Sequence, residues 1–208
     1  MNTVKLLAPL ALFAIASTAH ANIIVSSNGS QLVSDVAGAQ TFDFGADANG
    51  CGGYASCYGD FAFLQEGNPS LYAKPAGLAD DDWFLTVPYD NSGGTATFSL
   101  GFSADYFGLL WGSIDSYNTI TFLSDGNTVG TFSGGDSPIE PADGNQAASF
   151  FVEFWFEDGL SFDAIEFDST QRAFETANHA VRAVPAPGAL ALLGASLLGL
   201  ALVRRRLG

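Results

Sequence analysis

The chain has 208 residues and carries 22 acidic against 7 basic side chains, so its formal net charge is −15. All 22 acidic residues lie between positions 22 and 183 with only three of the basic ones, which gives this region a formal charge of about −19. Such a surface excludes nucleic acid as a partner, because contacts to phosphate need a basic patch. The length of this region fits one domain with a full core.

Residues 1–21 have the three parts of a secretory signal peptide. Lys5 gives a positive start, residues 6–16 are apolar, and Ala19 and Ala21 form a small-x-small cleavage site. We therefore expect export through the Sec translocon and cleavage by signal peptidase after Ala21.

An all-β domain is predicted over residues 22–183. Aromatic and β-branched residues alternate with polar ones, Gly and Asp-Gly breaks recur, and few stretches look helical. The expected strands, in chain order, are two short ones within 22–36 around Asn28-Gly29, then 40–45, 60–64, 83–89, 95–102, 117–123, 128–132, 148–158, 161–169 and 174–184. Ten to twelve short strands of this kind are typical of a single two-sheet β-sandwich of jelly-roll type.

Alternation within the strands predicts which residues face the core. One expected core set is Ala96, Phe98 and Leu100. In the stretch 148–158, one face carries Phe150, Val152, Phe154 and Phe156, and the other carries Phe151, Glu153, Trp155 and Glu157. A hairpin is expected around Asp125-Gly126, because Gly readily takes the positive φ that such turns demand.

The two cysteines of the chain lie in the sequence CGGYASC. Because the exported region is in an oxidising compartment, Cys51 and Cys57 are expected to form a disulfide that closes a Gly-rich loop. Tyr54 and Tyr58 are expected to be exposed on this loop. A zinc site is poorly supported, because the spacing is not C-x-x-C and His179 is far away in the sequence.

The motifs of catalysis are largely missing from the sequence. His179 is the one histidine that remains after signal cleavage, and no nucleophile motif surrounds it, so a structural role is favoured over a Ser-His-Asp site. Glycoside hydrolysis needs only two carboxylates. Glu153 and Glu157 beside Trp155 are one such pair, and the alternative is that they form the solvent face of an outer sheet.

The stretch WGSIDSYN carries the best candidate binding residues: Trp111, Asp115, Tyr117 and Asn118. Aromatic faces stack on sugar rings, while Asp and Asn supply hydrogen bonds. The alternative, which the sequence favours, is that Trp111 is a core residue and that Gly112 and Asp115 shape a turn.

The acidity of the domain has two interpretations. The favoured one is solubility, and the other is binding of divalent cations. Calcium ligands could come from Asp80, Asp81 and Asp82, or from Asp125 with Asn127, but no EF-hand spacing occurs. We therefore expect no cofactor and no firm metal site.

The chain ends in an apolar segment and a basic cluster. Residues 188–203 carry no charge and, as a helix rising ~1.5 Å per residue, would be about 24 Å long, which local thinning of a ~30 Å hydrocarbon core accommodates. Arg204, Arg205 and Arg206 follow and stay in the cytoplasm by the positive-inside rule. Residues 184–208 are thus expected to anchor the exported domain in the inner membrane.

This tail resembles the PEP-CTERM sorting signal of exported bacterial proteins. The matching residues are Val184, Pro185, Ala186 and Pro187, then the apolar segment 188–203, then Arg204, Arg205 and Arg206, with Ala186 where the family usually has Glu. The resemblance implies recognition by an exosortase and transfer to the cell surface or extracellular matrix of a Gram-negative-type bacterium.

Two stretches of the domain add to this resemblance. Residues 106–122, YFGLLWGSIDSYNTITF, and residues 173–181, AFETANHAV, are similar to segments of exosortase-dependent β-sandwich proteins. The leading hypothesis is an exported, non-catalytic surface or matrix protein with exopolysaccharide as its candidate ligand. The alternative is a secreted carbohydrate-active enzyme that uses a carboxylate pair.

Overall fold

The computed structural model describes residues 22–45, 49–68, 70–139 and 141–185. These residues form eleven strands and no helix: β1 (Ile23–Asn28), β2 (Gln40–Thr41), β3 (Ser56–Gly59), β4 (Ala62–Leu64), β5 (Phe84–Val87), β6 (Gly94–Gly112), β7 (Asn118–Ser124), β8 (Asn127–Ser133), β9 (Ser149–Phe156), β10 (Phe162–Ser169) and β11 (Phe174–Ala183). The prediction of an all-β domain is confirmed.

The predicted signal peptide, with Ala19 and Ala21, lies outside the described residues. So does the sorting tail from Ala186 onward, including Pro187, the apolar segment 188–203 and the arginine cluster. Within the ranges that the structure describes, no helix is long and apolar enough to span a membrane.

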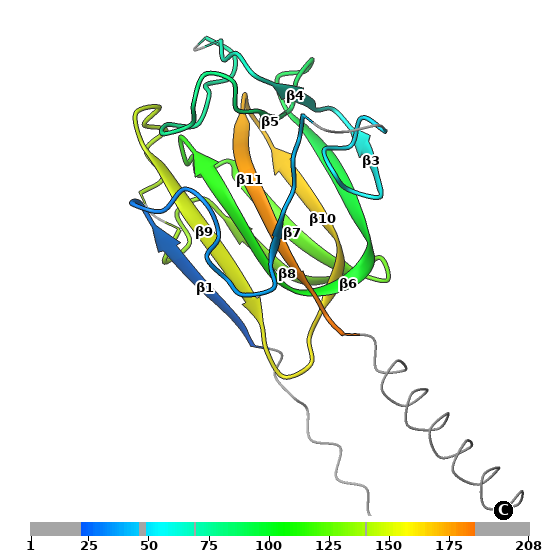
Figure 1. Cartoon of the computed structure of the whole chain (residues 1–208). Coiled ribbons are helices and arrows are strands. Elements are labelled where there is room, and N and C mark those ends of the chain that lie inside the picture. Colours follow the sequence, from blue (N-terminus) through cyan, green and yellow to red (C-terminus); the bar gives the residue numbers. More distant parts are fainter. Residues whose placement is uncertain (1–21, 46–48, 69, 140, 186–208) are drawn as a thin grey trace, which may run out of the picture.

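The strands form two layers that share one strand, β6 (Figure 1). One layer has the order β8-β7-β10-β6-β3, built on the first half of β6. The other has the order β1-β9-β6-β11-β5-β4, built on the second half of β6, with β2 added to β11. This arrangement is the predicted β-sandwich.

A bend near Gly101 takes β6 from one layer to the other. Its pairing with β10 is regular up to Ser99 and resumes irregularly at Ala104, and the residues between, 101–103, are exposed. Gly101 has φ +77°, a conformation that side chains rarely adopt. The bulge therefore redirects the strand.

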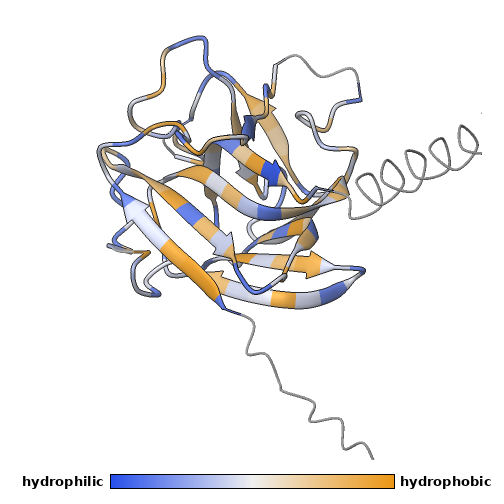
Figure 2. Ribbon diagram, turned by 60° about the horizontal axis from the view of Figure 1, so that its bottom comes forward, coloured by the Kyte–Doolittle hydropathy of each residue, from blue (hydrophilic) through white to orange (hydrophobic). Residues whose placement is uncertain are grey.

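The main core lies between the two layers and follows the predicted alternation. Hydrophobic and hydrophilic residues alternate along the strands (Figure 2). The predicted core residues Ala96, Phe98 and Leu100 are all buried. In β9, Val152, Phe154 and Phe156 are buried in this core with Phe150 packed against it. The register expected for both strands is confirmed.

A second, smaller core lies on the outer face of the layer that contains β11. Its buried residues are Phe84, Leu110, Phe151 and Ala177, with Leu64, Tyr72 and Leu78 packed against them. The segment 65–83 between β4 and β5 supplies the cover. It lies so close to β6 that a Cβ at Gly112 would be 2.9 Å from Pro75.

The hairpin prediction is confirmed, while four other predictions need correction. Asp125 and Gly126 join β7 to β8 with φ +50° and +77°. The strand expected at 95–102 is much longer, because β6 continues to Gly112. The region 22–36 holds only β1, because residues 29–36 leave the sheet edge, and 40–45 is a strand only at Gln40–Thr41. The Gly-rich loop after residue 45 ends in a strand, β3, paired with β6.

The predicted disulfide is confirmed. Cys51 and Cys57 are bonded, with their Cα atoms 5.5 Å apart, within the usual range for a disulfide. The loop that they close does not expose both tyrosines. Tyr58 is 70% exposed, as expected, but Tyr54 is only 2% exposed, because the loop turns its ring into the core.

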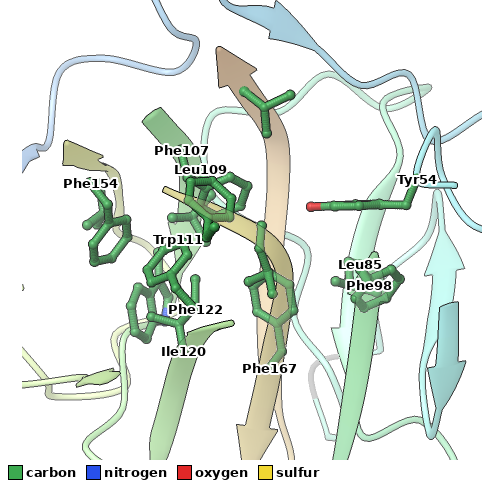
Figure 3. Packing of buried hydrophobic residues seen from close by; sticks show 14 of the residues in the cluster. Tyr54, Leu85, Phe98, Phe107, Leu109, Trp111, Ile120, Phe122, Phe154 and Phe167 are labelled. Carbon is green, nitrogen blue, oxygen red and sulfur yellow. The ribbon is translucent and has the colours of Figure 1, made fainter. Parts of the chain in front are cut away.

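Tyr54 belongs to a buried polar network that joins the disulfide loop to β11. Its hydroxyl points into the core (Figure 3) and lies 2.7 Å from Nδ1 of His179. Nε2 of His179 lies 2.8 Å from Oγ1 of Thr176, and the imidazole stacks on Phe167. Both ring nitrogens are satisfied, so His179 is structural, as the sequence favoured. Burial lowers its pKa from 6.5 to about 3.

We predict that Tyr54→Phe lowers the free energy of unfolding by about 1–3 kcal/mol, because it leaves a buried nitrogen of His179 without a partner. Urea denaturation of the purified protein measures this. Tyr58→Phe is the matched control, since its exposed hydroxyl should contribute less than about 0.5 kcal/mol. Equal effects of the two substitutions would contradict the role given to the network.

Candidate functional site

A polar pocket lies at the end of the sandwich opposite the two ends of the described domain. At the near end, Ile23 pairs with Phe156, and β11 finishes at Ala183 (Figure 1). At the far end, β6 finishes at Gly112 beside the start of β11. There the pocket, about 140 Å³ in volume, is lined by residues that include Tyr72, Ser113, Asp115, Tyr117, Arg172 and Glu175.

Glu175 forms the floor of this pocket. It is the second residue of β11 and is only 2% exposed. Its Oε1 accepts a hydrogen bond from the backbone N–H of Ala73 (2.7 Å), and its Oε2 accepts one from Oγ of Ser113 (3.1 Å). Burial, and then the charge of Asp115, raise the pKa of Glu175 from 4.5 to about 8 despite these bonds. The carboxyl group is therefore mainly neutral at pH 7.

Asp115 and Tyr117 form one wall. The hydroxyl of Tyr117 donates to Oδ2 of Asp115 over 2.8 Å. Burial, with a smaller contribution from the charge of Asp143, raises the pKa of Asp115 above its ordinary value. The loop before β9 packs tightly here, since a Cβ at Gly144 would lie 2.6 Å from Oδ1 of Asp115.

Arg172 lines the pocket, but its charge is engaged elsewhere. Its guanidinium donates to the backbone carbonyls of Asp90 and Asn91. Those residues are held in turn by the carboxylate of Asp60, which accepts their backbone N–H groups. Towards the pocket, Arg172 presents a carbonyl that lies 3.2 Å from the hydroxyl of Tyr117.

The four candidate binding residues from the sequence separate into two pairs. Asp115 and Tyr117 line the pocket. Trp111 and Asn118 are fully buried: Trp111 stacks on Phe174 in the core, and Asn118 bonds to Ser169. For Trp111 the structural interpretation is the right one, so it is not available to a ligand.

Ser113 connects β6 to the pocket in an unusual backbone conformation. Its φ is +41°, in the left-handed region that is unfavourable for a residue with a side chain. This conformation brings its hydroxyl to Glu175 immediately after β6 ends at Gly112. Strained residues of this kind are often found at functional sites.

The carboxylate pair considered from the sequence, Glu153 and Glu157, does not form a site. Glu153 accepts hydrogen bonds from Ser26 and Tyr106, and Glu157 lies beyond the end of β9. Trp155, between them, is covered by the guanidinium of Arg182 at 5.2 Å from the ring centroid. Neither glutamate lines the pocket described above.

Two of the calcium ligands considered from the sequence form local hydrogen bonds. Asp82 accepts from the backbone N–H of Ala79, and Asn127 donates to the carbonyl of Asp125. Among the described residues, no group of three or more His, Cys, Asp or Glu side chains is arranged to hold a metal ion.

Glu175 is the main residue that the sequence analysis missed. The one signal in the sequence is that Glu175 is the only acidic residue of the strand Phe174–Ala183. A buried charge of that kind needs a partner. The partner, however, is the backbone of Ala73, 102 residues away in the sequence.

Comparison with known proteins adds little. No family model and no curated protein matches the chain. Similar solved structures include a fucose binding module of Streptococcus pneumoniae (10% identity, TM-score 0.33, 49% of this chain and 73% of that one). Others are the C-terminal CBM6 of LamC, a laminarinase from Zobellia galactanivorans (10%, 0.37, 69% and 98%), and the enzymatically active domain of bacteriophage CBA120 tailspike protein 4 (15%, 0.37, 78% and 19%). These TM-scores are too low to carry an argument about this chain.

The two perturbed buried groups predict a plateau of stability between about pH 4.5 and 6.5. Below pH 6.5 the unfolded chain protonates His179 while the folded one does not, so stability falls as the pH drops towards 3. Above pH 4.5 the unfolded chain loses the proton of Glu175 while the folded one keeps it, so stability falls as the pH rises towards 8. Between these limits the two slopes oppose each other.

We therefore expect Glu175→Gln to remove the loss of stability between pH 6.5 and 8 and to turn the plateau between about pH 4.5 and 6.5 into a continued rise, because only the His179 slope remains there. The slope below pH 4.5 should not change. Thermal unfolding midpoints from pH 3 to 9 measure the effect. Glu157→Gln, at an exposed position, is the matched control and should keep the wild-type profile. A Glu175→Gln profile parallel to the wild type above pH 6.5 would rule out this assignment.

Proposed function

We propose that the protein is an exported, exosortase-sorted surface or matrix protein whose β-sandwich binds polysaccharide without catalysis. Export is supported by the signal-peptide pattern of residues 1–21. Sorting is supported by the tail that resembles a PEP-CTERM signal, with its Val184-Pro185-Ala186-Pro187 motif, apolar segment and arginine cluster. In this proposal the tail anchors the protein in the inner membrane until an exosortase processes it.

One observation carries the binding part of the proposal: the polar pocket at the end of the domain remote from Ala183. A domain tethered through its C-terminal strand would present that end outward, away from the membrane. The pocket combines the carboxylate of Asp115 with the hydroxyls of Tyr117 and Ser113. Saccharide hydroxyls both donate and accept hydrogen bonds, so a wall of this composition suits them.

The volume of the pocket, about 140 Å³, limits the size of the saccharide that it can bind. Typical small-molecule sites enclose roughly 300–1,000 Å³. The pocket thus suits one ring or a chain end of a polysaccharide rather than a long stretch of it.

Asp115 and Glu175 line the same pocket, and this carboxylate pair suggests a second candidate function, glycoside hydrolysis. Glu175 would hold the proton of a general acid at neutral pH, as its raised pKa shows. Its burial speaks against this, because Glu175 is only 2% exposed and is held by hydrogen bonds from Ala73 and Ser113. A general acid must reach the leaving oxygen of its substrate. Binding is therefore the preferred function.

Asp115→Asn should weaken binding of oligosaccharides prepared from the matrix of the producing cells by about tenfold, since a charged acceptor typically contributes ~1.5–3 kcal/mol. Isothermal titration calorimetry measures the affinity. Asp125→Asn makes the same change in the β7–β8 turn, outside the pocket, and should bind as wild type. Absence of binding by the wild type would refute the proposed function. Hydrolysis of the oligosaccharides by the wild type, with loss of that activity in Glu175→Gln, would support the enzymatic function instead.

The sorting part of the proposal predicts a processed protein. In cells with the exosortase, intact mass should show loss of residues 1–21 and of the segment after Pro187, with the protein at the surface or in the matrix. In cells without the exosortase, the tail should remain and fractionate with the inner membrane. An unprocessed, membrane-bound protein in both strains would show that Ala186 prevents recognition.

A further inference from the structure

A second pocket lies beside the middle of β11, on a different part of the surface. It has a volume of about 150 Å³ and is lined by Phe42, Asp43, Phe44, Asp81, Asp82, Trp83 and Asn178. None of these residues lines the pocket that contains Asp115. The residues come from three segments: the chain after β2, the chain before β5, and the irregular part of β11.

Trp83 gives this pocket an accessible aromatic wall. It is 36% exposed, whereas Trp111 is fully buried and Trp155 lies beneath Arg182. One part of the indole is held by the backbone, because a Cβ at Gly45 would lie 2.5 Å from its Nε1. The ring is therefore fixed from one side while part of it stays open to solvent.

The remaining walls are pre-organised by contacts with the core. The backbone N–H of Phe42 donates to the carbonyl of His179, and the ring of Phe42 packs edge-on against Tyr54 at 4.6 Å. Phe44 is buried against His179. Asn178 has φ +51° and is held by a 2.9 Å bond from its amide to the carbonyl of Leu32. Asn is one of the few residues that adopt this left-handed conformation readily, and the hydrogen bond fixes Asn178 in place.

We propose that this pocket is a second saccharide subsite, in which an uncharged pyranose ring stacks on Trp83 and hydrogen-bonds to the flanking aspartates. A fixed, partly exposed indole binds the apolar face of a sugar ring. Carboxylates accept hydrogen bonds from its hydroxyls.

The charge of the pocket defines the sugar class. It is lined by three aspartates and no basic residue, so uronic acids and sulfated sugars are repelled. This inference rests on the proposed function, that the protein binds saccharide, and adds a second, separate site to it.

The exposed state of Trp83 supplies a direct measurement. Acrylamide quenching of tryptophan fluorescence in the purified protein should report mainly on Trp83, and a Trp155→Phe background removes the half-buried second contributor. The probes are neutral cello-, laminari- and chitin oligosaccharides, with oligogalacturonate as the acidic comparison. We expect at least one neutral probe to reduce the quenching constant about twofold.

Variants separate the two sites. Because Trp83→Ala removes the reporting fluorophore, this variant is measured by calorimetry, and it should weaken the affinity of that probe about tenfold. Tyr58→Ala removes another exposed aromatic ring, outside both pockets, and should have no effect. Asp115→Asn should leave the protection of Trp83 intact.

The outcomes distinguish failure of this inference from failure of the proposed function. Calorimetric binding of oligosaccharide that depends on Asp115 but never protects Trp83 overturns the second subsite and leaves the proposed function standing. Stronger protection by oligogalacturonate than by neutral probes overturns the assigned sugar class. Absence of protection with every neutral probe overturns the second subsite, whereas the proposed function is decided separately by the calorimetric titration with matrix oligosaccharides.

Discussion

The passage of β6 through both layers is the constraint on which the rest of the structure depends. One strand of 19 residues pairs with β10 in one layer and with β9 and β11 in the other. From the bend at Gly101 the second half of β6 runs to its last residue, Gly112, which pairs with Glu175 near the start of β11. The pocket forms there, and Ser113 is the first residue after that strand.

Local patterns in the sequence were enough to predict the strands with one buried face. The alternation in β9 and the Asp125-Gly126 turn each encode their geometry within a few residues, so both predictions hold. The prediction for Tyr54 failed because its burial depends on His179, 125 residues later in the chain. A Gly-rich, disulfide-closed loop resembles an exposed loop until that distant partner is known.

The same reasoning explains why half of the candidate site was predictable. Asp115 and Tyr117 are two residues apart and bond directly to each other, so a short motif contains them. Glu175 enters the pocket only because the segment 65–83 folds back over β11 and supplies the N–H of Ala73. No periodicity in the sequence specifies that crossing. The close approach of Pro75 to Gly112 does, however, leave no room for a side chain at position 112.

The segment 65–83 also links the two pockets. Tyr72 lines the first, Trp83 lines the second, and between them the segment covers the small outer core around Leu110 and Ala177. The buried carboxyl of Glu175 accepts the N–H of Ala73 in this segment, so one hydrogen bond joins the floor of the first pocket to the segment that covers the outer core. A buried carboxyl is costly unless it is hydrogen-bonded and kept neutral. Its cost is offset by the apolar area that the docked segment covers, which is why a polar pocket can lie directly beside a hydrophobic core in this domain.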